Sequence, residues 1–227
     1  MQIRAAFIYS GLASLAAAYP IQPPKQCSHQ SKGFTLEVRP KDFGNKLVKP
    51  GESVTSLHIG AGRAIAGVSD KNPRIWYLNG TDDSLHGKTY SFLTDGGSPS
   101  FPSGFSIGPS EDHLSNVTIN AGDGTEFTFA TASKQPTAFD ITLALGVYAV
   151  CEVAIPYYRG KSFKVLKYIN PPVEEQDDLP KFEIPEGCVQ VILLPQCAGL
   201  PELPENAIAS HEHAVTVGCD KDVESRQ

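Results

Sequence analysis

The stretch Val147–Leu194 begins with VYAVCEVAIPYYRGKSFKVLKYI, passes through a proline-rich acidic loop and ends with CVQVILL. Its apolar, β-branched segments predict three strands, with a turn at Arg159-Gly160 between the first two. Cys151 lies in the first predicted strand and Cys188 at the entry to the last. A bond between these cysteines would tie the end of a β domain to its penultimate hairpin.

The chain before this stretch shows the same β pattern. Apolar and polar residues alternate in Gly33–Arg39, Val54–Ile59 and Leu114–Ile119, as in half-buried strands. Further strands are predicted at Arg74–Leu78, Lys88–Leu93, Phe105–Ile107 and Glu126–Ala130, and the small residues of Gly60–Val68 favour a tight sheet corner. No helical periodicity follows the first eighteen residues. The fold class expected is all-β, an antiparallel β-sandwich (Ig-like or jelly-roll-like), with an open barrel as the alternative.

Both ends of the chain differ from this central region. Residues 1–18 combine Arg4, an apolar run and Ala16-Ala17-Ala18, the pattern of a secretory signal peptide. Residues 19–32 predict an extended arm, 33–194 the β domain and 195–227 an irregular cysteine-containing tail. We therefore expect a secreted, extracellular protein. The net charge of −6 without a basic cluster argues against nucleic acid and anionic membranes as partners.

An exported chain is expected to oxidise its cysteines and to be glycosylated at exposed sequons. Five cysteines are present, an odd number that leaves one free or linked to another chain. Sequons lie at Asn79 and Asn116, and the turn-like NGTDD context favours Asn79.

Several segments in order resemble a family of secreted ascomycete fungal proteins known only as a domain of unknown function. They are GFTLEV, SLHIGAGRAIAGV, RIWYLNGT, SNVTINAGDGTEFTF, VYAVCEV and PEGCVQVILLP, which together span about Gly33–Leu194. The resemblance implies a compact, exported β-rich domain with one disulfide, placed here on Cys151 and Cys188. Cys197 and Cys219 would then close the tail as a second pair. Cys27 would be left over, available for a disulfide-linked dimer. The resemblance gives no indication of which activity, if any, the protein has.

Two motifs suggest catalytic or metal chemistry. Gly104–Gly108 matches G-x-S-x-G, in which a strand-to-helix turn would expose Ser106 as a nucleophile, with His211 or His213 as base. Pro109 and the lack of a following helical pattern argue against that context. His211 and His213 also match the spacing of two metal ligands, but the sequence offers no convincing third ligand. We expect no metal and no cofactor.

Other clusters are better explained by structure than by chemistry. The carboxylates of residues 174–178 lack the spacing of a calcium loop and indicate a solvated linker. The aromatic residues Trp76, Tyr157 and Tyr158 are candidate ligand contacts, because sugar C–H faces stack on rings. The prediction is a non-enzymatic protein that binds a glycan, a cell wall or a host surface. A small secreted serine hydrolase or esterase using Ser106 is the alternative.

Overall fold

The computed structural model describes residues 29–42, 44–80, 88–111, 113–122, 126–129, 147–170 and 184–220. The expected signal peptide, Cys27 and the acidic residues 174–178 lie outside these ranges. Within them, no helix is long and apolar enough to cross a membrane.

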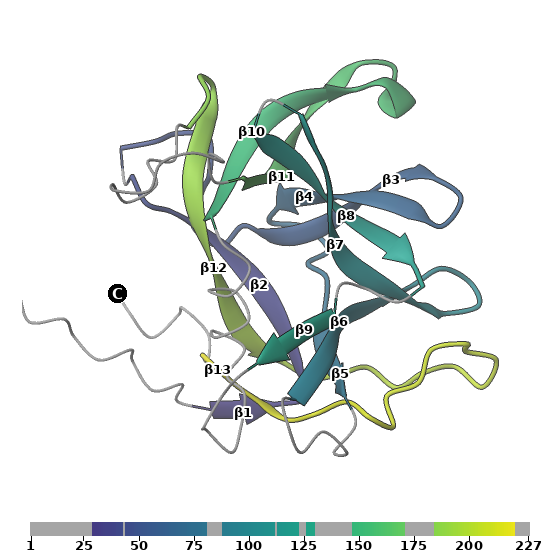
Figure 1. Ribbon diagram of the computed structural model, residues 1–227. Helices are drawn as coiled ribbons and strands as arrows, with labels where there is room; N and C mark the ends of the chain where they lie inside the picture. Colours follow the sequence, from purple (N-terminus) through teal and green to yellow (C-terminus); the bar gives the residue numbers. More distant parts are fainter. Residues whose placement is uncertain are drawn as a thin grey trace, which may run out of the picture.

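The regular secondary structure of the described residues consists almost wholly of strands (Figure 1). A single short helical turn, η1 (Pro156–Tyr158), joins two of them. The strands are β1 (His29–Ser31), β2 (Gly33–Pro40), β3 (Ser53–Gly60), β4 (Arg63–Ser69), β5 (Trp76–Gly80), β6 (Lys88–Gly96), β7 (Phe101–Glu111), β8 (Leu114–Ala121), β9 (Glu126–Phe129), β10 (Val147–Ile155), β11 (Lys161–Ile169), β12 (Cys188–Ala198) and β13 (Val217–Cys219).

Eleven strands form one large antiparallel sheet that curves around the core. Each strand of the series β2–β12–β10–β11–β8–β7–β6–β5 pairs with the next, and β5 pairs back to β2 through Phe34 and Trp76. The β3–β4 hairpin is inserted between β2 on one side and β8 and β11 on the other. The fold is therefore the expected all-β antiparallel sandwich, with its layers joined at their edges by backbone pairing.

Aromatic side chains fill the space that the sheet encloses. Trp76 is fully buried, and its ring centroid lies 4.8 Å from that of Phe92 and 5.7 Å from that of Phe105. Phe34 stacks on Phe92, and Tyr148 meets Phe105 edge-on. Such contacts add about 0.5–1.5 kcal/mol per pair to the free energy of burying the rings. Burial corrects the expectation that Trp76 is a ligand contact, because its side chain lies in the core and does not reach the surface.

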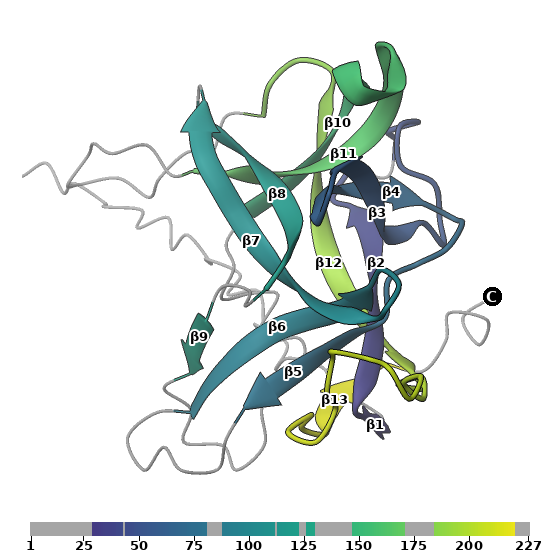
Figure 2. The ribbon, with the colours of Figure 1, turned by 90° about the vertical axis from the view of Figure 1, so that its right-hand side faces the viewer.

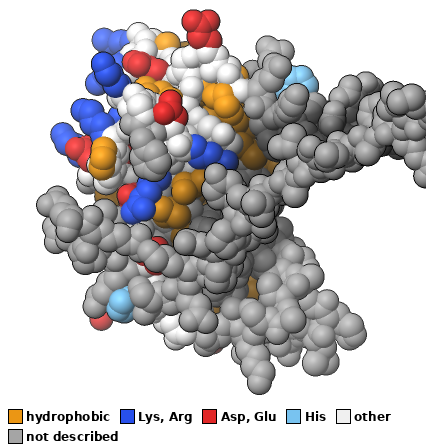
Figure 3. All heavy atoms as spheres, turned by 90° about the vertical axis from the view of Figure 1, so that its left-hand side faces the viewer, with side chains coloured by type: hydrophobic (Ala, Val, Ile, Leu, Met, Phe, Trp, Pro, Cys, Tyr) orange, Lys and Arg blue, Asp and Glu red, His pale blue; other side chains and the backbone are white. Residues whose placement is uncertain are grey.

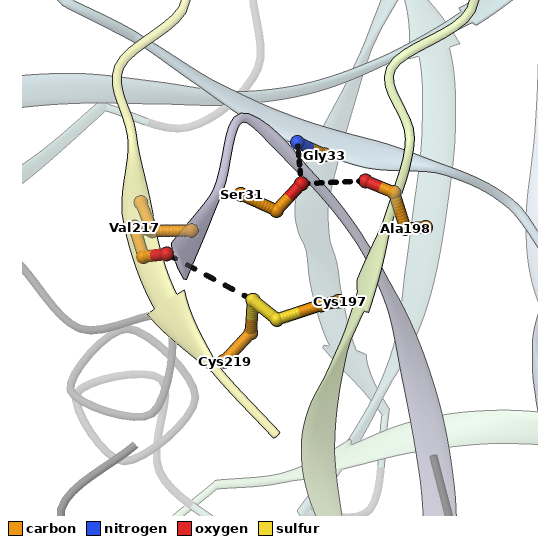
Figure 4. Close-up of a disulfide and its surroundings, with 6 residues drawn as sticks. All are labelled: Ser31, Gly33, Cys197, Ala198, Val217 and Cys219. Carbon is orange, nitrogen blue, oxygen red and sulfur yellow. Dashed lines mark hydrogen bonds between the residues drawn. A yellow bond between two sulfur atoms is a disulfide. The ribbon is translucent and has the colours of Figure 1, made fainter. Parts of the chain in front are cut away.

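The two ends of the described chain pair with each other. β1, in the segment expected to be an extended arm, forms a small second sheet with β13, in the segment expected to be an irregular tail. Figure 4 shows the disulfide beside this pair, in which Cys219 of β13 bonds to Cys197 of β12. Ser31 donates a 2.7 Å hydrogen bond from Oγ to the carbonyl of Ala198. The tail is thereby joined to the main sheet.

The second disulfide joins neighbouring strands of the large sheet. Cys151 of β10 and Cys188 of β12 lie directly opposite each other in the antiparallel register and are bonded. Both bonded pairs are the ones expected from the sequence.

The segment between β12 and β13 runs across β5 and the β6–β7 turn (Figure 2). Val215 donates its amide to the carbonyl of Leu78 at 2.9 Å, and Gly80 donates to the carbonyl of His213 at 3.2 Å. Ile208 and Ala209 both donate to the carbonyl of Ser100. These backbone bonds fix residues 208–215 in place.

Charge is unevenly distributed on the surface. Figure 3 shows a face on which lysine and arginine side chains gather over the upper part of the molecule, with hydrophobic and acidic side chains between them. Side chains of both charges therefore lie close together on this face.

Candidate functional site

A pocket of about 290 Å³ lies between the β3–β4 hairpin and the β6–β7 turn. Both features lie on the right of Figure 1 and face the viewer in Figure 2. Three basic residues line the pocket, His58, Arg63 and Arg74, together with the hydroxyls of Ser56 and Ser103. None of the described lining residues carries a carboxylate. Concave sites with a few convergent polar groups are the usual locations of ligand binding.

The β3–β4 hairpin positions the first wall of the pocket. Gly62 adopts a φ of +66°, which a residue without Cβ tolerates best, and lets the chain reverse directly after β3. Ser56 and His58 are two residues apart in β3 and so point to the same side. Arg63, at the start of β4, lies opposite Gly60. The tight corner expected around these small residues thus forms one edge of a pocket.

The β6–β7 turn forms the opposite wall. Gly97 has a φ of +81°, and a Cβ there would overlap the ring of Phe101. A Cβ on Gly96 would lie 3.6 Å from the guanidinium of Arg74. Glycine at position 97 therefore lets the Phe101 ring approach the backbone closely, whereas the contact at Gly96 is an ordinary van der Waals distance.

Arg74 is held in the wall by hydrogen bonds. Its Nη1 donates to the carbonyl of Asp95 at 2.6 Å, and its backbone amide donates to the carbonyl of Val54 at 3.0 Å. Burial lowers the pKa of this guanidinium, and the negative charge of Asp95 acts in the opposite direction. Because arginine starts from so high a pKa, Arg74 remains cationic at neutral pH.

Arg63 has a different environment from Arg74. It is exposed, and within the described part of the chain it forms no ion pair or side-chain hydrogen bond. One fixed cation and one cation without an ion-pair partner in the described part of the chain therefore line the same hollow. An anionic group entering the pocket would meet both guanidinium groups and no opposing carboxylate in its described lining.

A second polar cluster lies on the other side of β6. Asp95 and Gly96 are adjacent in the strand, so the Asp95 side chain points away from the pocket. Its Oδ2 lies 2.7 Å from Nε2 of His211, and its Oδ1 accepts a 3.1 Å hydrogen bond from the hydroxyl of Tyr77. The rings of Tyr77 and His211 meet edge-on at 4.8 Å. This cluster attaches the C-terminal segment to β6.

The Asp95 cluster contains His211, one of the two histidines of the His-x-His pair found in the sequence. His211 is engaged with Asp95, whereas His213 is exposed. Among the described residues, no three His, Cys, Asp or Glu side chains are grouped as a metal site requires.

Ser106 does not lie at a nucleophile elbow, the context that the alternative serine hydrolase would need and that Pro109 already argued against. Ser106 lies within β7, which continues to Glu111, and pairs with Thr118 of β8. Its carbonyl accepts a 3.3 Å hydrogen bond from Oγ1 of Thr118. The motif needs a sharp strand-to-helix turn to expose its serine, and Ser106 is instead part of a continuous ladder.

The other predicted contact residues lie beside the pocket. Tyr157 in η1 is 55% exposed, and its ring centroid lies 5.3 Å from that of His58, a pocket residue. Tyr158 is half-buried and packs on the apolar cluster around Ile155 and Val165. The sequence predicted these tyrosines as ligand contacts, but no pattern in it indicated that β3 would place His58 next to Tyr157.

The two sequons differ in exposure. Asn116 is exposed in β8, and its Oδ1 accepts a 2.6 Å hydrogen bond from Nζ of Lys167. Asn79 is half-buried at the end of β5, and its side-chain oxygen is enclosed. Glycosylation stays a prediction at both sites, and exposure favours Asn116 over Asn79, the reverse of the order expected from the sequence.

Comparison with known proteins gives a family of unknown function. The model of a domain of unknown function, DUF7907, matches residues 31–197. The chain is also similar to the antigenic protein SchS34 of Stachybotrys chartarum, with 33% identity over 211 residues that cover 91% of this chain and 94% of that protein. No solved structure matches.

Proposed function

The chain belongs to the DUF7907 family of unknown function, and we propose that it is a non-enzymatic extracellular protein that binds an anionic group in the pocket between the β3–β4 hairpin and the β6–β7 turn. The observation that carries the proposal is the convergence of Arg63 and Arg74 on a hollow whose described lining holds no carboxylate. Guanidinium groups bind carboxylate, sulfate and phosphate through paired N–H donors.

The extracellular location is supported by the chemistry of the cysteines and by the N-terminal sequence. Two disulfides are characteristic of proteins that mature in oxidising compartments. Residues 1–18 have the pattern of a secretory signal peptide. The relative from Stachybotrys chartarum is named as an antigen, which fits a protein met outside the cell.

Binding without catalysis is supported by the character of the pocket residues. Arg63 and Arg74 keep their charge at neutral pH and are poor proton-transfer groups. Ser56 and Ser103 are the pocket hydroxyls, and His58 contacts the ring of Tyr157. These groups suit the orientation of a charged ligand by hydrogen bonds. The ligand in this proposal is a small anion or the acidic end of a cell-wall or host molecule.

Calorimetric titration of the secreted protein with phosphate, sulfate and glucuronate tests the proposal. We expect binding by at least one anion that weakens with added salt, because part of the attraction is electrostatic. Arg63→Gln should weaken it roughly tenfold or more, the usual loss for a hydrogen bond to a charged group.

Lys41→Gln is the matched control. It removes the same unit of charge from an exposed residue outside the pocket and should leave the affinity unchanged. Equal weakening by both variants would show that only net charge matters and would overturn the pocket assignment. The absence of binding by all three anions at millimolar concentration would overturn the proposal as well.

A further inference from the structure

A continuous row of aromatic rings begins at the rim of the pocket and leads away from it. The ring of His58, which lines the pocket, meets Tyr157 edge-on with 5.3 Å between centroids. Tyr157 meets Tyr158 at 5.3 Å, and Tyr158 meets Phe163 at 4.7 Å. Lys161 lies 5.3 Å above the Phe163 ring. We call these rings, from His58 to Phe163, the aromatic row.

The fold holds this row rigidly. Arg159 adopts a φ of +57° and donates its amide to the carbonyl of Pro156 at 2.9 Å, which closes η1. Gly160 donates to the carbonyl of Ile155 at 3.1 Å. Below the turn, Tyr158 packs against a small apolar cluster separate from the main core. The backbone that carries Tyr157 is thus set before any ligand arrives, which lowers the entropic cost of binding.

The packing of the fold does not account for the exposure of the Tyr157 ring. It is 55% exposed and, with Ile192 and Ile208, is one of the large apolar side chains that the described surface leaves open. Single exposed apolar residues need no explanation. Here, however, the exposed ring adjoins a cationic pocket through the shared residue His58.

We propose that the pocket and the aromatic row form one binding site for an acidic oligosaccharide. The anionic group of a terminal sugar binds Arg63 and Arg74, and the next sugar lies against Tyr157. Guanidinium groups fit the planar carboxylate or the sulfate of such a sugar, and sugar C–H faces pack on aromatic rings. The proposal rests on the proposed function and adds to it the class of ligand and a second subsite.

Titration with a uronic-acid monomer, its trimer and a neutral glucose trimer separates the two subsites. We expect the acidic trimer to bind roughly fivefold more tightly than the monomer, the gain typical of one aromatic contact. The neutral trimer should bind too weakly to measure. A sulfated disaccharide, titrated in parallel, tells whether carboxylate or sulfate is the better anion.

Variants at the two subsites should behave differently. Tyr157→Ala should reduce the affinity for the acidic trimer to that for the monomer and leave monomer binding unchanged. Tyr157→Phe keeps the ring and should bind like the unaltered protein. Ile208→Ala removes another exposed large apolar side chain, which lies outside the site, and is the matched control. Arg63→Gln should weaken monomer and trimer alike.

The outcomes distinguish this inference from the proposed function. Monomer binding that depends on Arg63, without a gain for the trimer and without an effect of Tyr157→Ala, would overturn the oligosaccharide site alone. Tight binding of the neutral trimer would also overturn it, because the charge would then be irrelevant. The absence of binding by every anion, simple or saccharide, would overturn the proposed function with it.

Discussion

At the scale of single residues, two fully buried tyrosines differ in how their hydroxyls are satisfied. Tyr77 donates a hydrogen bond to the carboxylate of Asp95, whereas the enclosed hydroxyl of Tyr148 has no hydrogen-bond partner among the described residues. Burial raises the pKa of both phenols. The charge of Asp95 adds to the effect on Tyr77, and Tyr168 adds to the effect on Tyr148. The two residues thus form a matched pair for measuring the worth of one buried hydrogen bond.

We expect Tyr77→Phe to lower the free energy of unfolding at pH 7 by about 1.5–3 kcal/mol, the range for hydrogen bonds to charged groups. Tyr148→Phe should change it by less than about 0.5 kcal/mol or raise it, because the hydroxyl that it removes forms no hydrogen bond with any described residue. Urea denaturation of both variants measures the difference. Equal losses would contradict the assigned hydrogen bonding.

The same variants test the direction of the pKa shifts. A tyrosine whose pKa is raised in the folded state ionises first in the unfolded chain, at about pH 10. Its contribution to stability is full below that pH and is lost as the pH rises toward the folded-state pKa, by about 1.4 kcal/mol per pH unit. Above pH 10, each Phe variant should therefore lose stability less steeply than the unaltered protein.

At the scale of elements, local pattern predicted the strands well where alternation was strong. β2, β3 and β8 begin and end within two residues of the expected positions. β7 was predicted only at Phe105–Ile107, because glycine, serine and proline hide a strand that runs over eleven residues. β1 escaped prediction because it is three residues long and pairs with the far end of the chain.

The candidate site was less predictable than the fold because it depends on contacts distant in sequence. Arg63 and Arg74 stand in unremarkable sequence contexts, and only the meeting of the β3–β4 hairpin with the β6–β7 turn brings them together. His211 and Asp95 are separated by 116 residues. Only Tyr157 and Tyr158 were identified from the sequence, through a turn beside two adjacent aromatic residues.

The contact between His211 and Asp95 leads to a prediction about the C-terminal segment. Both side chains are less than one-fifth exposed, so the pair is better shielded than a surface ion pair. His211→Ala should release residues 208–215 from β5 without unfolding the sheet. Hydrogen exchange should then quicken several-fold at the amide of Val215, which donates to Leu78.

His213→Ala is the control for the loss of an imidazole in the same segment. His213 is exposed and contributes its backbone carbonyl, which the substitution keeps. Exchange at Val215 should therefore remain as in the unaltered protein. If both variants accelerated exchange equally, the His211–Asp95 contact would not be what holds the segment.

At the scale of the whole molecule, the continuous pairing of the sheet depends on β12, which links β10 to β2. The disulfide between Cys151 and Cys188 lies at the first of these pairings and closes a loop of 37 positions. The bond between Cys197 and Cys219 closes 22 positions and attaches β13. In the chain-entropy model the two bonds are worth about 4 and about 3.5 kcal/mol.

Joint replacement of Cys151 and Cys188 by alanine should therefore lower the midpoint of thermal unfolding by roughly 10 °C, given a shift of about 2–4 °C per kcal/mol for a chain of this size. Cys27→Ala, at the cysteine left outside both pairs, should change it little. Calorimetry of the purified proteins under non-reducing conditions measures both effects. An equal loss from Cys27→Ala would mean that Cys27 takes part in a structural bond.

The joint replacement of Cys151 and Cys188 should also affect binding, because β10 leads directly into η1, which carries Tyr157. It should loosen Tyr157 and lower the affinity for the acidic trimer more than the affinity for the monomer. Such a result would connect the stability of the large sheet to the proposed binding site.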